Sequence, residues 1–139
     1  MIHCVDASVV LRVLLQEPGW EAAKEWFALH VNDELIAPHF MPTEVLSTLR
    51  RKCRSGQLTS EQARDALRFL AELGLRLVWS WALAERALAL AEELDQPTVY
   101  DSLYLAVAEE AGCEFWTADE RFVRCAASRY PFVRLLNLG

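Results

Sequence analysis

The sequence predicts an α/β fold in which a mostly parallel sheet carries helices on both of its faces. Short apolar segments of strand length alternate along the chain with longer segments of helical periodicity, as in proteins that join parallel strands by crossover helices. The chain has 139 residues, of which 53% are hydrophobic and 24% are charged, enough to bury a substantial core. Because no repeat, linker or low-complexity segment interrupts it, we assign residues 1–139 to a single domain.

Five short apolar segments have the features of buried strands, and most are bounded by polar residues, glycine or proline. Such boundaries are typical of strands that end in turns or hand over directly to helices. The expected strands are residues 2–5, 35–37, 75–79, 114–117 and 132–136. We therefore expect a central sheet of about five strands.

The segments between the strands show helical periodicity together with start and stop signals. Thr59 to Gln62 has the form of a capping box, and Ser80 precedes another helical segment as an N-cap. Gly56 and Gly112 follow two of the segments, where glycine commonly ends a helix. The expected helices are residues 7–15, 20–30, 42–54, 59–74, 80–94, 99–111 and 120–127.

Four carboxylates lie at the junctions between these strands and helices. Asp6 and Asp119 directly follow strands, whereas Glu44 and Asp101 lie in the first turns of helices. In an open parallel sheet, ligands bind beyond the carboxyl ends of the strands, so these residues can converge on one edge although they are distant in sequence. Carboxylates that share a pocket repel one another unless a cation lies between them, and Mg²⁺ and Mn²⁺ prefer such oxygen ligands.

Each carboxylate also has a purely structural interpretation. Asp6 and Asp119 could cap the helices that follow them, and Glu44 could complement the dipole of its helix. Asp101 follows Thr98 by three residues, an aspartate variant of the capping box. Interactions of these kinds contribute about 0.5–2 kcal/mol each and are common, so the combination of four is more informative than any single one.

Two hydroxyl side chains strengthen the hypothesis of a metal site. Ser8 lies two residues after Asp6, and Thr117 lies two residues before Asp119. Hydroxyls in such positions can orient ligating carboxylates or hold water bound to a metal ion, and metal sites depend on supporting interactions of this kind. We therefore interpret Ser8 and Thr117 as supporting polar residues.

Four motifs, in this order, carry a resemblance that extends over essentially the whole chain. They are Val5-Asp6-Ala7-Ser8, Pro42-Thr43-Glu44-Val45, Tyr100-Asp101-Ser102-Leu103-Tyr104 and Thr117-Ala118-Asp119-Glu120-Arg121-Phe122. With these motifs the chain resembles a PIN domain, in particular the small toxin subunit of VapBC toxin–antitoxin systems. Each motif is weak alone, but all four at compatible spacing are specific.

The resemblance implies a three-layer α/β/α fold and an endoribonuclease that depends on Mg²⁺ or Mn²⁺. Asp6, Glu44, Asp101 and Asp119 would form the catalytic, metal-binding set, with Ser8 and Thr117 in support. The metal would polarise a phosphate and activate water for in-line attack, which leaves 5′-phosphate and 3′-hydroxyl ends. The resemblance also implies an RNA substrate, a homodimer and a small cognate antitoxin that covers the acidic pocket.

Other functions are weighed against this one. A haloacid-dehalogenase-like phosphatase requires an aspartate where this chain has Ser8. Such a phosphatase and a receiver domain both also need a lysine late in the chain, but the lysines here are Lys24 and Lys52 only. Its scattered glycines exclude a P-loop or dinucleotide-binding motif. Two alternatives stay open: a stand-alone PIN nuclease that processes RNA, and a non-catalytic PIN-like scaffold that binds RNA or protein.

The net charge of −6 and the pI near 5.1 argue against a generic nucleic-acid coat protein. One dense basic run, Arg50, Arg51, Lys52 and Arg54, could nevertheless contact RNA phosphates. The preferred alternative is that these cations complement the C-terminal dipole of their helix and stay solvated. A looser basic set comprises Arg121, Arg124, Arg129 and Arg134.

Three further expectations concern histidines, tryptophans and cysteines. The histidines His3, His30 and His39 show no metal-ligand spacing and are interpreted as structural. Trp79 and Trp81 would share a strand face if their strand extended that far.

The chain has neither a basic N-terminal region that would mark a signal peptide nor an apolar segment long enough to span a membrane. We therefore expect a cytoplasmic protein without membrane association, whose cysteines are reduced: Cys4, Cys53, Cys113 and Cys125.

Overall fold

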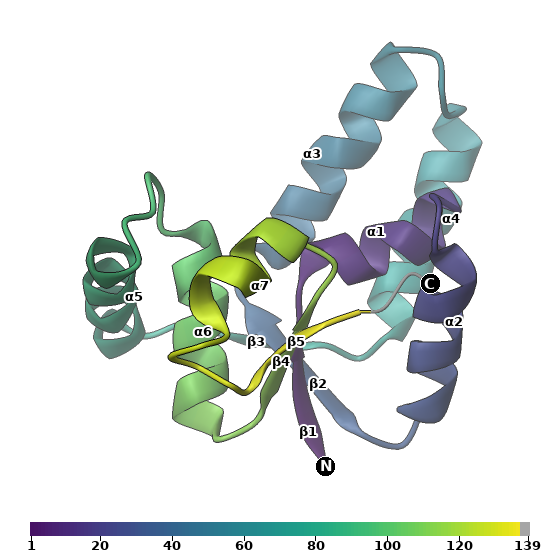
Figure 1. Ribbon diagram of the computed structural model, residues 1–139. Coiled ribbons are helices and arrows are strands. Elements are labelled where there is room, and N and C mark those ends of the chain that lie inside the picture. Colours follow the sequence, from purple (N-terminus) through teal and green to yellow (C-terminus); the bar gives the residue numbers. More distant parts are fainter. Residues whose placement is uncertain (137–139) are drawn as a thin grey trace.

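A computed structural model describes residues 1–136 and confirms the predicted α/β fold (Figure 1). Its sheet has five strands in the order β3-β2-β1-β4-β5, and every neighbouring pair is parallel. The first strand in sequence is therefore the central strand, and the chain builds outward from it in both directions. The strands are β1 (Ile2–Val5), β2 (Glu34–Pro38), β3 (Arg76–Val78), β4 (Glu114–Thr117) and β5 (Val133–Leu135).

The helices form the two outer layers. Figure 1 shows α5 and α6 on one side of the sheet and α1, α2 and α4 on the other, while α3 projects beyond the carboxyl ends of the strands. All seven predicted helices are present, and their boundaries differ from the expected ones by a few residues at most. They are α1 (Ala7–Leu15), α2 (Trp20–Leu29), α3 (Met41–Arg54), α4 (Ser60–Glu72), α5 (Trp81–Glu93), α6 (Tyr100–Ala111) and α7 (Glu120–Ala126).

Helix α6 lies at the centre of the core because it is covered on all sides. Every residue from 102 to 108 is buried, which is the pattern of a helix packed between a sheet and a second helix rather than of a surface helix. It packs against β1, β2 and β4 on one side and α5 on the other. Gly112 ends it in the left-handed conformation, with φ of 64°, as its position in the sequence predicted.

The structure confirms two of the predicted helix caps. The Thr59 side chain accepts a hydrogen bond from the backbone N–H of Gln62, and the Gln62 side chain accepts one from the N–H of Thr59, which completes the capping box. Ser80 likewise accepts from the N–H of Leu83 at the start of α5. These signals are local, so the sequence is sufficient to locate them.

Two structural possibilities that the sequence raised do not hold. Val99 rather than Thr98 precedes α6, and no side chain caps that helix, so Asp101 takes no part in a capping box. Strand β3 ends at Val78 and Trp81 begins α5, so Trp79 and Trp81 share no strand face. Their rings instead meet edge to face across the turn, with centroids 5.7 Å apart.

The remaining global features agree with the sequence. All four cysteines are free thiols, with Cys4 buried in the core and the others partly accessible. Within residues 1–136, no helix combines the length and the apolar character required to cross a membrane.

Candidate active site

The fold brings the four predicted carboxylates to the carboxyl edge of the sheet. Asp6 follows the central strand β1 and is only 7% exposed, and Asp119 follows the neighbouring strand β4. Glu44 and Asp101 lie in the first turns of α3 and α6, and both are half-buried. The negative charges of Asp6, Asp119 and Glu44 each act on the carboxyl group of Asp101, so the four residues share one electrostatic environment.

Asp6 is held by two hydroxyl groups rather than by its own helix. Although it occupies the N-cap position of α1, its side chain makes no capping hydrogen bond. Instead Ser8 Oγ and Thr117 Oγ1 donate to Asp6 Oδ2 over 2.6 and 2.8 Å. The capping interpretation of Asp6 is therefore wrong, and both hydroxyls act on one oxygen, which leaves Oδ1 free of them.

The same hydroxyls tie the two strand ends together. Ser8 Oγ accepts a hydrogen bond from the backbone N–H of Ala118 over 3.0 Å, and Thr117 Oγ1 accepts one from the N–H of Asp119 over 3.0 Å. Asp119 in turn caps α7, since its Oδ1 accepts from the N–H of Phe122. The predicted supporting residues thus connect the end of β1 with the β4–α7 junction and orient the two aspartates relative to each other.

Tyr104 connects Glu44 on α3 with Ala7 at the start of α1. The sequence patterns did not predict this role for Tyr104. Its buried hydroxyl donates to Glu44 Oε1 over 3.0 Å and accepts from the backbone N–H of Ala7 over 3.2 Å. Its ring stacks on Phe115, with centroids 5.5 Å apart and planes 15° from parallel. The available signal was its position three residues after Asp101, which places both side chains on the same face of α6.

Burial and mutual repulsion disfavour the ionised forms of three carboxyl groups. Burial raises the pKa of Asp6, although the hydrogen bonds from Ser8 and Thr117 oppose the shift. Burial and the charge of Asp6 raise the pKa of Glu44 above its usual range. For Asp101, burial followed by the charges of Asp6, Asp119 and Glu44 raises the pKa to about 7.

The site has the chemical character of a cation site. None of the four carboxylates takes part in an ion pair within residues 1–136, so no arginine, lysine or histidine compensates their charge. Their ligand atoms are all carboxylate oxygens, the donors preferred by Mg²⁺ and Mn²⁺. Among residues 1–136, no three of these carboxylates have oxygens that all lie within 4.8 Å of one another.

The predicted basic run lies on the projecting helix α3. Arg50, Arg51 and Arg54 are exposed, whereas Lys52 is half-buried. A surface groove of about 510 Å³ extends along this helix from Thr43, the neighbour of Glu44, to its C-terminal end, and its lining residues are Thr43, Leu46, Ser47, Arg50, Arg51 and Arg54. In the looser basic set, three arginines form ion pairs with glutamates, namely Arg124, Arg129 and Arg134.

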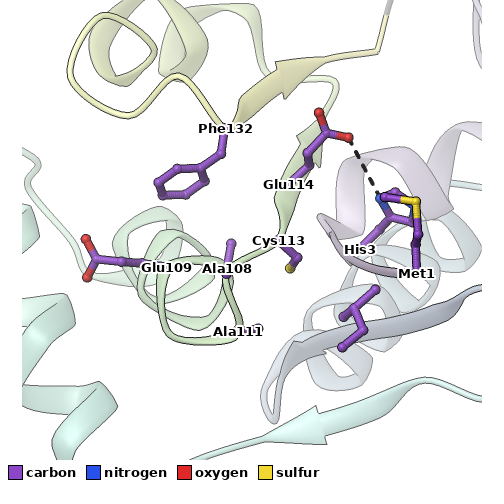
Figure 2. Close-up of a pocket in the computed structure, with 10 residues that line it drawn as sticks. Met1, His3, Ala108, Glu109, Ala111, Cys113, Glu114 and Phe132 are labelled. Carbon is purple, nitrogen blue, oxygen red and sulfur yellow. Dashed lines mark ion pairs between the residues drawn. The ribbon is translucent and has the colours of Figure 1, made fainter.

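The three histidines, interpreted as structural from the sequence, include two that share one carboxylate. At the amino ends of the strands, His3 and His30 both contact the carboxylate of Asp33. His3 also faces a pocket of about 610 Å³, shown in Figure 2, where its ring approaches Glu114. The spacing of His30 and Asp33, three residues apart, was visible in the sequence, but only the fold adds His3 to them.

Comparison with known proteins agrees with this architecture. The model of the PIN domain family matches residues 3–128. This chain belongs to the PIN-domain family. It is similar to the VapC ribonuclease Mb0985 of Mycobacterium bovis and to ribonuclease VapC9 of Mycobacterium tuberculosis. Each is 30% identical over 127 residues, which cover 91% of this chain and 93% of the relative.

Solved structures with the same PIN-like fold include two that align over most of the chain. VapBC2 from Rickettsia felis, determined bound to a DNA fragment from its promoter, aligns with a TM-score of 0.68 and 17% identity, covering 91% of this chain and 94% of that one. PAE2754 from Pyrobaculum aerophilum aligns with a TM-score of 0.67 and 22% identity, covering 90% and 87%. At 17% and 22% sequence identity, these two structures show that the fold is shared and nothing further.

Removal of the Tyr104 hydroxyl should destabilise the protein. Tyr104→Phe leaves the buried N–H of Ala7 without its side-chain acceptor and Glu44 without its donor, so we expect the free energy of unfolding to fall by about 1–3 kcal/mol in a urea titration. The matched control is Tyr100→Phe, because Tyr100 is 56% exposed and should change stability by less than about 0.5 kcal/mol. Equal effects of the two variants would contradict the assigned role.

Without a divalent cation, the contribution of Asp101 to the stability of the protein should fall as the pH rises. The pKa of Asp101 is about 7 in the folded protein against an ordinary value of 3.8, so folding favours its protonated form. Its contribution is complete below about pH 4 and is lost as the pH rises through about 7. In EDTA, Asp101→Asn should therefore melt at a higher temperature than the wild type at pH 8, but not at pH 4.

The control for this measurement is Asp95→Asn, which removes an exposed charge outside the acidic site and should melt like the wild type at both pH values. Mg²⁺ at pH 8 should raise the melting temperature of the wild type more than that of Asp101→Asn, since the variant lacks one of the compensated charges. If Asp101→Asn and the wild type melt together at pH 8, the repulsion inferred at this site is absent.

Proposed function

We propose that this protein is a metal-dependent endoribonuclease that acts as the toxin of a type II toxin–antitoxin pair. The observation that carries the proposal is the convergence of four carboxylates, without a cationic partner in the described residues, at the carboxyl edge of a PIN-domain sheet. Its similarity to relatives named VapC ribonuclease supports RNA as the substrate.

The proposed ligands of the metal are Asp6, Glu44, Asp101 and Asp119. A bound Mg²⁺ or Mn²⁺ would supply Lewis-acid polarisation of a phosphate and lower the pKa of an attacking water. Ser8 and Thr117 hold the Asp6 carboxylate through Oδ2, so Oδ1 is left free of these hydroxyls and available to a metal ion. Tyr104 holds Glu44 in the same way through one oxygen.

The projecting helix α3 offers a surface on which the RNA backbone can lie. Thr43, Ser47, Arg50 and Arg54 all line the groove along this helix and follow one another at helical spacing along one face. This face begins beside Glu44, so a strand bound to the arginines would lead toward the acidic site. Cationic side chains contact phosphates without regard to sequence, which suits positioning of the substrate rather than selection of a base.

We also propose that a small antitoxin inhibits this protein and that the toxin forms a homodimer. The similarity to VapC ribonucleases, and in fold to VapBC2 of Rickettsia felis, supports the antitoxin. An acidic site without a cationic partner among residues 1–136 could receive a basic side chain of such an inhibitor, because that residue would neutralise the same charges as a metal ion.

Purified protein should cut a labelled pool of total RNA into discrete products in Mg²⁺ or Mn²⁺ and should be inactive in EDTA. Asp6→Asn should abolish cleavage without loss of fold, because the amide oxygen of asparagine can still accept the hydrogen bonds from Ser8 and Thr117. Asp95→Asn serves as the matched control and should be fully active. The products should carry 5′-phosphate and 3′-hydroxyl ends.

Different results would favour the other functions. Binding of RNA without cleavage under any metal condition would indicate a non-catalytic scaffold. Metal-dependent cleavage that survives Asp6→Asn and co-purifies with the variant would contradict the assignment of the site, whereas cleavage that separates from it would indicate a contaminating nuclease. Metal-dependent cleavage by a protein that no neighbouring antitoxin gene accompanies would indicate a stand-alone nuclease.

Reversal of charge on α3 should weaken RNA binding. In an Asp6→Asn background, which prevents cleavage, Arg50→Glu combined with Arg54→Glu should lower affinity. The salt slope of the binding constant should also fall by about one for each phosphate that the variant no longer binds. Arg129→Glu combined with Arg134→Glu makes the same change in net charge at arginines paired with glutamates. If the two double variants weaken RNA binding equally, net charge alone accounts for the effect, and α3 has no specific role in binding.

A further inference from the structure

A second group of metal-ligating side chains lies at the amino ends of the strands, away from the acidic site. His3 lies in β1, His30 follows the C-terminal end of α2, and Asp33 lies in the turn before β2. His3 Nε2 is 3.1 Å and His30 Nδ1 is 2.8 Å from the same oxygen, Asp33 Oδ2. One nitrogen of each histidine and one oxygen of Asp33 lie within 4.8 Å of one another. These three atoms can therefore face a common centre.

The surroundings hold the two imidazole rings in place. His3 is 3% exposed, and its ring lies 4.3 Å from that of His30, measured between centroids. The buried indole of Trp26 contacts both rings, with centroids 4.4 Å from His30 and 5.8 Å from His3. Ligands whose orientation is set by packing lose little conformational freedom when an ion binds.

The hydrogen bonding of His3 is incomplete without a further ligand. If neutral His3 donates from Nε2 to Asp33, its Nδ1 is an unprotonated acceptor. That atom is buried, it has no hydrogen-bond partner within residues 1–136, and it faces the Glu114 carboxylate at 4.0 Å (Figure 2). A lone pair directed at a carboxylate is repulsive, and buried polar atoms without a partner are uncommon.

A metal ion on Nε2 would resolve this arrangement. The ring proton would then lie on Nδ1 and face Glu114, the combination of metal, histidine and carboxylate that is usual in metal sites. Glu114 is itself oriented, since its Oε2 accepts a hydrogen bond from Arg134 Nε over 2.8 Å. It also lies beside His3 in the register of β1 and β4.

We propose that His3, His30 and Asp33 form a second metal site, which takes a borderline transition ion of the Zn²⁺ class. Two imidazole nitrogens and one carboxylate oxygen are ligands typical of Zn²⁺, whereas Mg²⁺ prefers oxygen alone. Three protein ligands leave a fourth position for water or another ligand. Access is available, because His3 lines the pocket of about 610 Å³ in Figure 2 and His30 and Asp33 line another of about 360 Å³.

This site is independent of RNA cleavage. It joins the first strand, the end of α2 and the turn before β2, so a bound ion would clamp α2 to the sheet at the edge opposite the acidic site. Its expected effect is on stability: an ion that binds only the folded chain raises the melting temperature as its free concentration rises above its dissociation constant.

The site can be tested with untagged, full-length protein in excess Mg²⁺, which keeps the acidic oxygen ligands occupied. Zn²⁺ is titrated in competition with a chromophoric chelator, and Co²⁺ absorption reports coordination by nitrogen. The wild type should bind one Zn²⁺ per chain and melt at a higher temperature with it. His30→Gln should weaken binding about tenfold or more and remove the thermal shift. His30 is partly exposed, so this variant should keep the fold.

Two controls accompany this variant. His39→Gln removes an exposed histidine outside the cluster and should bind Zn²⁺ like the wild type. Cys113→Ala removes a thiol that lines the same pocket as His3, and it should also bind normally. These two results, together with loss of binding in His30→Gln, would support the site.

Three results would overturn the proposal. Absence of Zn²⁺ binding in the wild type would mean that His3, His30 and Asp33 are only a hydrogen-bonded cluster. Unchanged binding in His30→Gln would place the ion elsewhere. Binding that is lost in Cys113→Ala but kept in His30→Gln would assign the ion to a thiol site.

Discussion

The carboxylate of Asp6 is buried at the end of the central strand, and the rest of the functional edge is arranged around it. The neighbouring strands β2 and β4 lead to Glu44 and Asp119, and two hydroxyls from β4 and the start of α1 converge on one oxygen of Asp6. A buried anion is costly unless hydrogen bonds or a cation compensate it. The hydroxyls supply part of the compensation, and the proposed metal would supply the rest.

At this edge of the sheet, the arrangement suited to the proposed function lowers the stability of the fold. Burial and repulsion within the acidic set favour protonation of Asp101 and Glu44, so the folded protein carries an electrostatic cost there, which the proposed metal would relieve. The packed core keeps the carboxylates close together despite this cost, because it holds them on well-packed helices and strands. Helix α6 is buried from residue 102 to residue 108, and Tyr104 on that helix links Glu44 to the start of α1. Strain at a functional site is commonly tolerated where the surrounding packing is well determined.

The central strand separates two chemically different environments. Its residues Cys4 and Val5 are fully buried and apolar, whereas His3 before them and Asp6 after them are buried polar groups toward opposite edges of the sheet. One edge offers only carboxylate oxygens and the other offers imidazole nitrogens with a single carboxylate. Because hard cations prefer oxygen and zinc-like ions accept nitrogen, the two edges differ in the ions that they would select.

Local sequence patterns were sufficient to predict the α/β class, the five strands, the seven helices, the acidic residues of the candidate site and the two hydroxyls beside them. The contacts of Tyr104 and His3, by contrast, were decided by the packing. The predictable features depend on periodicity, on caps such as Thr59 and Ser80, and on the rule that parallel strands end at one edge. Whether Asp6 caps its helix or accepts hydrogen bonds from hydroxyls was undecided, because both fit the same local pattern. Tyr104 reaches Glu44 across 60 positions and Ala7 across 97, and His3 meets Asp33 across 30. No periodicity within a single segment encodes such pairs, since they arise from the order of the strands and the packing of helices on them.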